Sequence, residues 1–236
     1  ANSDGDKQIA AITAGNGPDI AQNFWPTLSL WGKQGALEPL DEYIKKTNFD
    51  VQDFLPATIE QCSYNGNIVG LPFAAMSGEL YYNKDLLKEA GYENPPKTIE
   101  ELVEMSDKLT KVGKDGTIER MGYLPDYPWL DHVIWPVMFG CTFYDAKTKD
   151  APITDKNYIA AYQWQADIYK KYGPDKIEKF KSGFGTDASH PFITGKLAMM
   201  FNGEWMPASL GKFAPNLNYG VAPIPYPKDM PEQEGA

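Results

Sequence analysis

The chain has 236 residues, and its 32 acidic side chains against 22 basic ones give a formal net charge of -10. With 42% hydrophobic residues it has a globular composition and is long enough to bury a large core without disulfides or metals. The acidic balance argues against nucleic acid or an anionic membrane as the main partner, and no apolar stretch reaches the roughly 20 residues of a membrane-spanning helix.

Helix-like and strand-like segments alternate along the chain, which predicts an α/β fold. The expected helices span residues 7–14, 27–34, 84–90, 98–112 and 155–172, and the expected strands span 18–21, 67–74, 79–82, 122–124, 196–201 and 218–224. The clearest helix start is Thr98 with Glu101 three residues later, a capping box. That helix should bury Ile99, Leu102, Val103 and Leu109, and the 155–172 helix should bury Ile159, Tyr162, Ala166 and Tyr169.

Cysteine and histidine are scarce in this sequence. Cys62 and Cys141 are too few for a disulfide framework and wrongly spaced for zinc, so we expect two free, buried thiols, with a single bridge as the alternative. His132 and His190 each lack a second ligand three or four residues away. The sequence therefore predicts neither a metal site nor a cofactor.

A motif typical of a common enzyme class would identify a reaction. The sequence has no Gly-x-Ser-x-Gly elbow, no His-Glu-x-x-His and no phosphate-binding loop, and the Gly-rich segment 183–188 follows no expected strand. A glycoside hydrolase needs two facing carboxylates, but spacing selects no pair among the candidates Asp19, Glu79, Asp126, Asp131 and Glu204.

Three loops carry a tryptophan beside small polar or acidic residues, at 23–26, 126–129 and 202–205, and each follows an expected strand. Ligands of open α/β sheets bind beyond the carboxyl ends of strands. A flat aromatic ring contacts the C–H face of a sugar, while Asn, Asp and Glu bond its hydroxyls. The pattern favours a neutral, polyhydroxylated ligand, against the alternative that these tryptophans only fill the core.

Several segments, in chain order, resemble the extracellular solute-binding proteins of ABC importers, in the branch that binds maltose and other sugars. They include a Gly-x-Leu-x-Pro-Leu segment, a Tyr-Asn-Lys-Asp strand, a Pro-Pro-Lys-Thr box and a Gly-Lys-x-Ala-Met run followed by Asn-Gly-x-Trp. The matching residues are 9–20, 35–41, 64–72, 80–86, 95–102, 192–199 and 202–205.

The resemblance implies a two-lobed, type II periplasmic-binding-protein-like α/β fold that closes on its ligand by hinge motion. Residues 1–75 would form part of the N-terminal lobe and 76–82 the first hinge strand. Residues 83–220 would form the C-terminal lobe, and 221–236 the second hinge strand and the start of the return to the first lobe. Compared with the family pattern, we expect the fold to be incomplete at both ends.

The resemblance also implies which residues line the cleft between the lobes. Carried over by position, they are Asn23, Phe24, Trp25, Met76, Ser77, Glu79, Asp126, Trp129, Asp131, His132, Glu204 and Trp205. Met76 stands where the maltose binders have an acidic residue, and the first cleft loop lacks their second aspartate. Maltose specificity is therefore not implied.

The function implied is the carbohydrate-binding component of an ABC importer, without catalytic activity. Its partners would be a sugar and the permease subunits, and the protein would be a monomer outside the cytoplasmic membrane, extracellular or periplasmic and lipid-anchored or free. The signal segment is expected to lie upstream or to have been removed. Two alternatives stay open: a carbohydrate-active hydrolase, and a binder of a polyamine, peptide or metal chelate.

Overall fold

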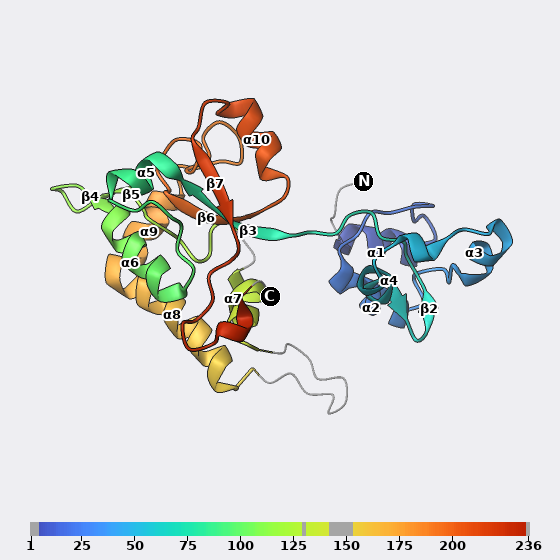
Figure 1. Ribbon diagram of the computed structural model, residues 1–236. Coiled ribbons are helices and arrows are strands. Elements are labelled where there is room, and N and C mark those ends of the chain that lie inside the picture. The colour runs from blue at the N-terminus through green and yellow to red at the C-terminus, as the bar shows by residue number, and fades with distance from the viewer. Residues whose placement is uncertain (1–4, 129–130, 142–152, 235–236) are drawn as a thin grey trace. The chain divides into compact units, whose positions relative to one another are not determined.

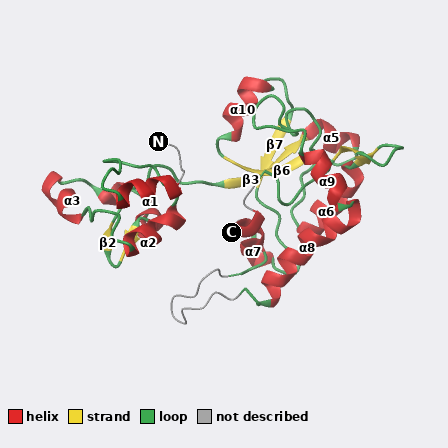
Figure 2. Cartoon of the chain, turned by 180° about the vertical axis from the view of Figure 1, so that it is seen from behind, coloured by secondary structure: helices red, strands yellow, loops and turns green. Residues whose placement is uncertain are grey.

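The computed structural model describes residues 5–128, 131–141 and 153–234. The chain divides into two compact units, Ala1–Ala75 and Met76–Ala236, which we name unit 1 and unit 2 (Figure 1). Figure 2 shows that unit 1 is mostly helix and loop, whereas unit 2 surrounds a small sheet with helices. Among the described residues, none of the helices combines the length and the apolar character needed to cross a bilayer.

Unit 1 is built from short helices and one small hairpin. The expected helices at 7–14 and 27–34 are confirmed as α1 and α2, and Trp31 of α2 is 3% exposed. The elements are α1 (Gly5–Thr13), α2 (Trp25–Lys33), α3 (Asp41–Thr47), the 3-10 helix Val51–Asp53, α4 (Pro56–Gln61), β1 (Ser63–Tyr64) and β2 (Asn67–Ile68).

Two strand predictions in unit 1 are wrong. Residues 18–21 form bends and loop, with Ile20 91% exposed, because no described strand of this unit lies alongside to accept their backbone hydrogen bonds. The expected strand 67–74 shrinks to β2, which pairs with β1 across a tight turn. The backbone of Ile68 bonds to the start of α3, since its N–H donates to the Asp41 carboxylate and its carbonyl accepts from the N–H of Leu40. Further along, Pro72 has no N–H to donate to a strand partner.

Unit 2 has a three-stranded antiparallel sheet of order β6-β3-β7, with helices on both faces. β3 is the central strand, so each of its residues faces a partner on β6, β7 or both. The elements are β3 (Gly78–Asn83), α5 (Lys84–Glu89), α6 (Ile99–Leu109), β4 (Lys111–Val112), β5 (Ile118–Arg120), α7 (Asp131–Met138), α8 (Lys156–Tyr172), α9 (Pro174–Lys181), β6 (Met199–Gly203), α10 (Met206–Phe213), β7 (Tyr219–Ala222) and the 3-10 helix Pro231–Gln233.

The two faces of this sheet bury separate hydrophobic clusters, because side chains alternate along a strand. Leu80 and Met199 pack with α5, α6, α7 and α8, in a cluster that includes Leu102 and Trp135. On the other face, Tyr81 and Met200 pack with side chains of α9 and α10. Figure 1 shows α6 and α8 along one side of unit 2 and α10 at another. The sheet therefore holds two helical layers in place.

The capping box is confirmed at the start of α6. Thr98 Oγ1 accepts from the N–H of Glu101 at 3.2 Å, and the Glu101 carboxylate accepts from the N–H of Thr98. Ile99, Leu102 and Leu109 are buried as expected, whereas Val103 is only half-buried. The helix ends at Leu109, ahead of the expected Gly113, because residues 111–112 pair with β5 instead.

The predicted buried face of α8 is wrong, although the helix itself is confirmed. Its buried residues are Ala161, Gln165 and Ile168, whereas Ile159 and Tyr162 are 56% and 39% exposed. The helix contacts both α7 and α9, so tertiary packing selects a face other than the most apolar one. Tyr158 and Tyr162 instead contact each other at 5.3 Å between ring centroids.

The expected strand at 122–124 is also wrong, although its residues are buried. Backbone pairing there is centred on a single bridge between Met121 and Leu197. Gly122 lies against the backbone of Ser106 in α6, where a Cβ atom would come 2.1 Å from the Ser106 carbonyl oxygen. The N–H of Gly122 donates to Thr110 Oγ1 at 2.9 Å, so it is not available to a neighbouring strand.

Replacing Thr98 by Ala should lower the free energy of unfolding by about 1 kcal/mol, because the N–H of Glu101 loses its acceptor. Urea denaturation followed by circular dichroism measures the change. Thr98→Ser keeps the oxygen and serves as the control, with an expected effect well below that of Ala. Equal losses in both variants would contradict a role for the hydroxyl in capping.

Candidate functional site

The start of β3 and the end of β6 meet in unit 2 and bring four of the expected site residues together. Gly78 faces Gly203, and Glu79 faces Asn202. Just beyond that pairing, the N–H of Ser77 donates to Glu204 Oε2 at 3.2 Å. Trp205 follows at once as the N-cap residue of α10. Ser77, Glu79, Glu204 and Trp205 therefore form one group, which we name the strand-end site.

Two glycines allow aromatic rings to lie against the backbone at this site. A Cβ atom on Gly203 would come 2.2 Å from ring atoms of Trp205, and one on Gly78 would come 2.1 Å from the ring of Phe201. The indole of Trp205 therefore rests over Gly203, and this side chain is 37% exposed. Such a ring is fixed in place but still offers surface to a ligand.

The polar groups of the strand-end site are mainly hydrogen-bond acceptors with negative charge. Oε2 of Glu79 is buried and has no hydrogen-bond partner among the described residues. Two residues along β3 on the same face, Tyr81 donates its hydroxyl to the carbonyl oxygen of Gly203 at 3.0 Å. Burial, followed by the charge of Glu79 and smaller contributions from Tyr219 and Glu204, raises the pKa of Tyr81 to about 12. Tyr81 therefore remains a protonated donor at neutral pH.

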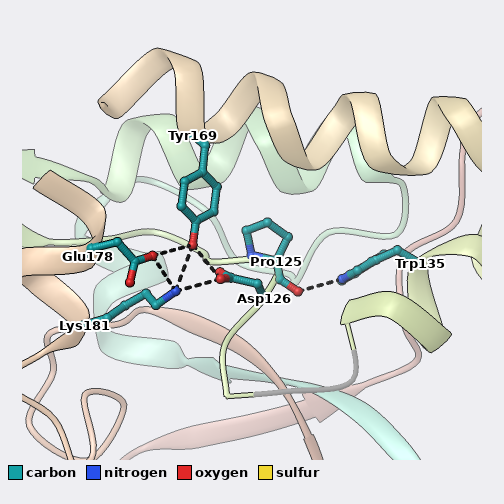
Figure 3. A network of polar contacts seen from close by, with 6 residues as sticks. All are labelled: Pro125, Asp126, Trp135, Tyr169, Glu178 and Lys181. Atoms are coloured by element: carbon teal, nitrogen blue, oxygen red, sulfur yellow. Dashed lines mark hydrogen bonds and ion pairs between the residues drawn. The ribbon is translucent and has the colours of Figure 1, made fainter. Parts of the chain in front are cut away.

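Asp126 lies in a different network, shown in Figure 3, that ties its loop to two helices. Oδ2 of Asp126 accepts from the hydroxyl of Tyr169 on α8 and, at 2.7 Å, from Lys181 Nζ on α9. Lys181 also donates to Glu178 at 2.9 Å. The neighbouring Pro125 carbonyl accepts from the indole N–H of Trp135 on α7 at 2.8 Å.

Burial and hydrogen bonds shift the pKa values of Tyr169 and Lys181 in this network. Burial and the bond to Asp126 raise the pKa of Tyr169. Burial acts to lower the pKa of Lys181, but its bonds to Asp126, Tyr169 and Glu178 outweigh that effect and raise it. Oδ1 of Asp126 is buried without a partner among the described residues. One oxygen of Asp126 thus anchors the loop and the other is left for a further donor.

The remaining expected site residues are not brought to the strand-end site by any described contact. Asn23 and Phe24 belong to unit 1, where Asn23 Oδ1 accepts from the N–H of Phe24, whose side chain is 68% exposed. Met76, at the start of unit 2, is 50% exposed. The side chains of Trp25, Asp131 and His132 and the whole of Trp129 lie outside the described residues.

The prediction that all three tryptophan loops follow strands holds for one loop. Residues 202–205 lie at the end of β6, whereas 23–26 lead from a loop into α2, and the loop at 126–128 follows the segment 122–124, which forms no strand. Only the sheet of unit 2 supplies a strand whose end carries such a loop among the described residues. The sequence pattern therefore placed the tryptophan loops after strands that, for two of the three, the described residues do not contain.

His190 and the two cysteines lie apart from the strand-end site in any described contact. His190 is 4% exposed, its Nδ1 accepts from the N–H of Phe192, and burial lowers its pKa to about 4, so it is neutral near pH 7. Both cysteines are free, but only Cys62 is buried and Cys141 is half-buried, which corrects the expectation for Cys141. The described residues contain no cluster of three or more His, Cys, Asp or Glu that could hold a metal ion.

The expected site residues did not include Tyr81, Asn202 or Gly203, which build the strand-end site, although the 202–205 loop that contains the last two was singled out. Tyr81 lies two residues after Glu79, and that alternation on a strand could have identified it. Asn202 is 4% exposed and its Oδ1 accepts from the N–H of Gly203, which fixes the turn into Trp205. The role of Gly203 depends on the ring that lies over it, which no local pattern reveals.

The chain belongs to the bacterial extracellular solute-binding protein family, whose sequence model matches residues 2–236. It is 29% identical over 225 residues to a maltotriose-binding protein of Pyrococcus abyssi, covering 91% of this chain and 43% of that protein. It is 26% identical to the sn-glycerol-3-phosphate-binding periplasmic protein UgpB of Salmonella paratyphi A, covering 94% of this chain and 51% of that protein.

Among solved structures, the chain is similar to CpMnBP1 with mannotriose bound. The TM-score is 0.85 at 36% sequence identity, and the match covers 94% of this chain and 57% of that one. The chain thus spans about half the length of the relatives it matches. The family and these relatives are binding proteins, and the family is extracellular.

Gly203→Ala should displace the indole of Trp205, because the added methyl group would overlap the ring. NMR of the indole N–H groups measures this, with the Trp205 resonance assigned by its loss in Trp205→Phe. Gly211→Ala is the matched control, since no atom lies within 4 Å of a Cβ placed there. An unshifted Trp205 resonance in Gly203→Ala would contradict the packing described.

Proposed function

We propose that the chain is the ligand-binding part of a solute-binding protein of an ABC importer, and that its ligand is a neutral mono- or oligosaccharide. The observation that carries this proposal is the partly exposed ring of Trp205, held over Gly203 at the strand ends where Glu79 and Glu204 also lie. The sugar-bound relatives support the same class of ligand.

The chemistry of the strand-end site suits a sugar better than a purely apolar or an anionic ligand. A pyranose ring presents apolar C–H groups on its face, which pack on indole, and hydroxyl donors at its edge. Glu79 Oε2 is a buried acceptor that lacks a donor, and a sugar hydroxyl would supply one. The carboxylates of Glu79 and Glu204, which both act on Tyr81, would repel a phosphate or a carboxylate group of a ligand.

We extend the proposal to the rest of the protein from its family. Unit 1 would be part of the N-terminal lobe, 76–82 the first hinge strand, 83–220 the C-terminal lobe, and 221–236 the second hinge strand and its continuation. Ligand would be held as the lobes close, by the strand-end site together with Asn23, Phe24, Trp25, Met76, Asp126, Trp129, Asp131 and His132.

The loaded protein would deliver the sugar to the permease subunits of the importer and would not catalyse a reaction. We propose that it acts as a monomer outside the cytoplasmic membrane, anchored there by lipid or free. Thermal unfolding of the full-length protein against mono- and oligosaccharides, amines and peptides tests the ligand class, since a ligand of the native state raises the midpoint. A midpoint raised only by amines or peptides, or formation of sugar products, would refute the proposal.

Trp205→Ala should weaken binding of mannotriose by about 1–3 kcal/mol, roughly 5- to 150-fold in Kd, because one stacking surface is lost. Isothermal titration calorimetry on the full-length protein measures the change. Trp205→Phe keeps a smaller ring and should lose less. Unchanged affinity in Trp205→Ala, with the protein folded, would remove this residue from the site.

Glu79 should discriminate against acidic sugars. We expect a trisaccharide of uronic acids to bind about tenfold or more weakly than mannotriose, because its carboxylates meet those of Glu79 and Glu204. Glu79→Gln should narrow this difference, whereas Glu93→Gln, an exposed residue outside the site, should leave it unchanged. Equal binding of both trisaccharides to the unaltered protein would contradict the electrostatic argument.

A further inference from the structure

Unit 2 contains a hollow of about 550 Å³ that shares no residue with the strand-end site. It lies where the β4–β5 hairpin meets α9, and Figure 1 shows these elements next to each other. Its volume is within the usual range of small-molecule pockets. We name it the lysine hollow, and it is lined by Asp115, Gly116, Thr117, Ile118, Glu119, Lys176, Lys179, Phe180, Phe184 and Lys196.

Three ammonium groups surround the hollow and form no close ion pair among the described residues, although Lys179 attracts the Asp115 carboxylate electrostatically. Lys176 and Lys179 lie three residues apart on α9, which places them on one side of the helix, and Lys196 comes from the segment that precedes β6. Lys181, on the same helix, differs from them because it is fully engaged with Asp126, Tyr169 and Glu178. The unpaired lysines are thus those that α9 turns toward the hollow.

The two carboxylates of the hollow are directed toward the hairpin itself. Asp115 Oδ1 accepts from the N–H and the hydroxyl of Thr117, at 3.0 and 2.7 Å. Glu119 Oε1 lies 2.8 Å from the position a Cβ atom would take on Gly113. Lys176 Nζ lies over the hairpin turn, 3.3 Å from the Cβ position of Gly116. Three lysines against two carboxylates among the lining residues leave a local excess of positive charge, in a chain of net charge -10.

The base of the hollow is aromatic. The rings of Phe180 and Phe184 meet edge to face, with centroids 4.8 Å apart and an interplanar angle of 77°. Phe180 is 9% exposed, so most of its surface is already packed, and Phe184 is partly buried beside it. An apolar body could therefore rest on fixed rings while its charged end reaches the lysines.

We propose that the lysine hollow binds a small organic anion that joins an apolar ring or chain to a phosphate or carboxylate group. Charge complementarity selects the anionic end, because ammonium groups bind phosphate and carboxylate oxygens as point charges. The phenylalanine pair selects the apolar end. The occupant differs in charge from the neutral sugar proposed for the strand-end site, so the two sites would not compete for one ligand.

Phenyl phosphate is a suitable probe because it carries both features. Titrated into the ¹⁵N-labelled full-length protein at low salt, it should shift the amide resonances of Gly113, Gly116, Thr117 and Lys179 in a saturable manner. Phenol and inorganic phosphate, which each carry one feature, should bind at least about tenfold more weakly. Absence of saturable shifts at these amides, or equal binding of inorganic phosphate alone, would overturn the proposal.

The variant Lys176→Gln with Lys179→Gln should weaken phenyl phosphate binding about tenfold or more. Lys170→Gln with Lys212→Gln removes the same charge outside the hollow and should leave binding unchanged. Equal losses in the two variants would show a general effect of net charge and overturn the site. If the first variant does not fold, the comparison of phenyl phosphate with phenol and inorganic phosphate on the unaltered protein decides the question.

Discussion

The antiparallel pairing of β3 with β6 is the constraint on which the rest of unit 2 depends. It places Gly78 opposite Gly203 and so lets the rings of Phe201 and Trp205 lie against backbone at the strand ends. The same pairing turns Tyr81 and Met200 to one face and Leu80 and Met199 to the other, where separate helical layers pack. A shift of the pairing register by one residue would move these side chains to the opposite faces and disrupt both hydrophobic clusters and the strand-end site.

Buried polar groups of unit 2 occur at two places that matter for the candidate site, the Asp126 network and Glu79. Lys181 and Asp126 neutralise each other and, with Tyr169, fix a loop to α8 and α9, so their charge contributes to architecture. Oε2 of Glu79 has no partner among the described residues, at a cost in stability that a donor from a ligand would offset. Oδ1 of Asp126 is likewise buried without a partner among the described residues, so each of the two groups keeps one acceptor for a further donor.

Local signals in the sequence identified the elements whose ends are set by their own residues. The capping box of α6, the start of α5 at Asn83 and that of α8 at Asp155 are side-chain contacts within three residues, and all are present. The expected strands at 79–82, 196–201 and 218–224 are present as β3, β6 and β7, whereas those at 18–21 and 122–124 are not, since a strand needs a partner supplied from elsewhere in the chain. Helices α3, α4, α7, α9 and α10 were not predicted because each has at most 8 residues and so little apolar periodicity, and α7 also contains Pro136.

The sequence by itself determined the family, the aromatic and acidic residue types of the candidate site, and the segments where those residues fall. Only the tertiary structure decided that Ser77, Glu79, Glu204 and Trp205 share one strand end, while Asp126 is held in another network. It also decided which face of α8 is buried, and which lysines of α9 form no close ion pair among the described residues. The physical reason is that pairing register and helix packing join residues far apart in the chain, and no local periodicity records those contacts.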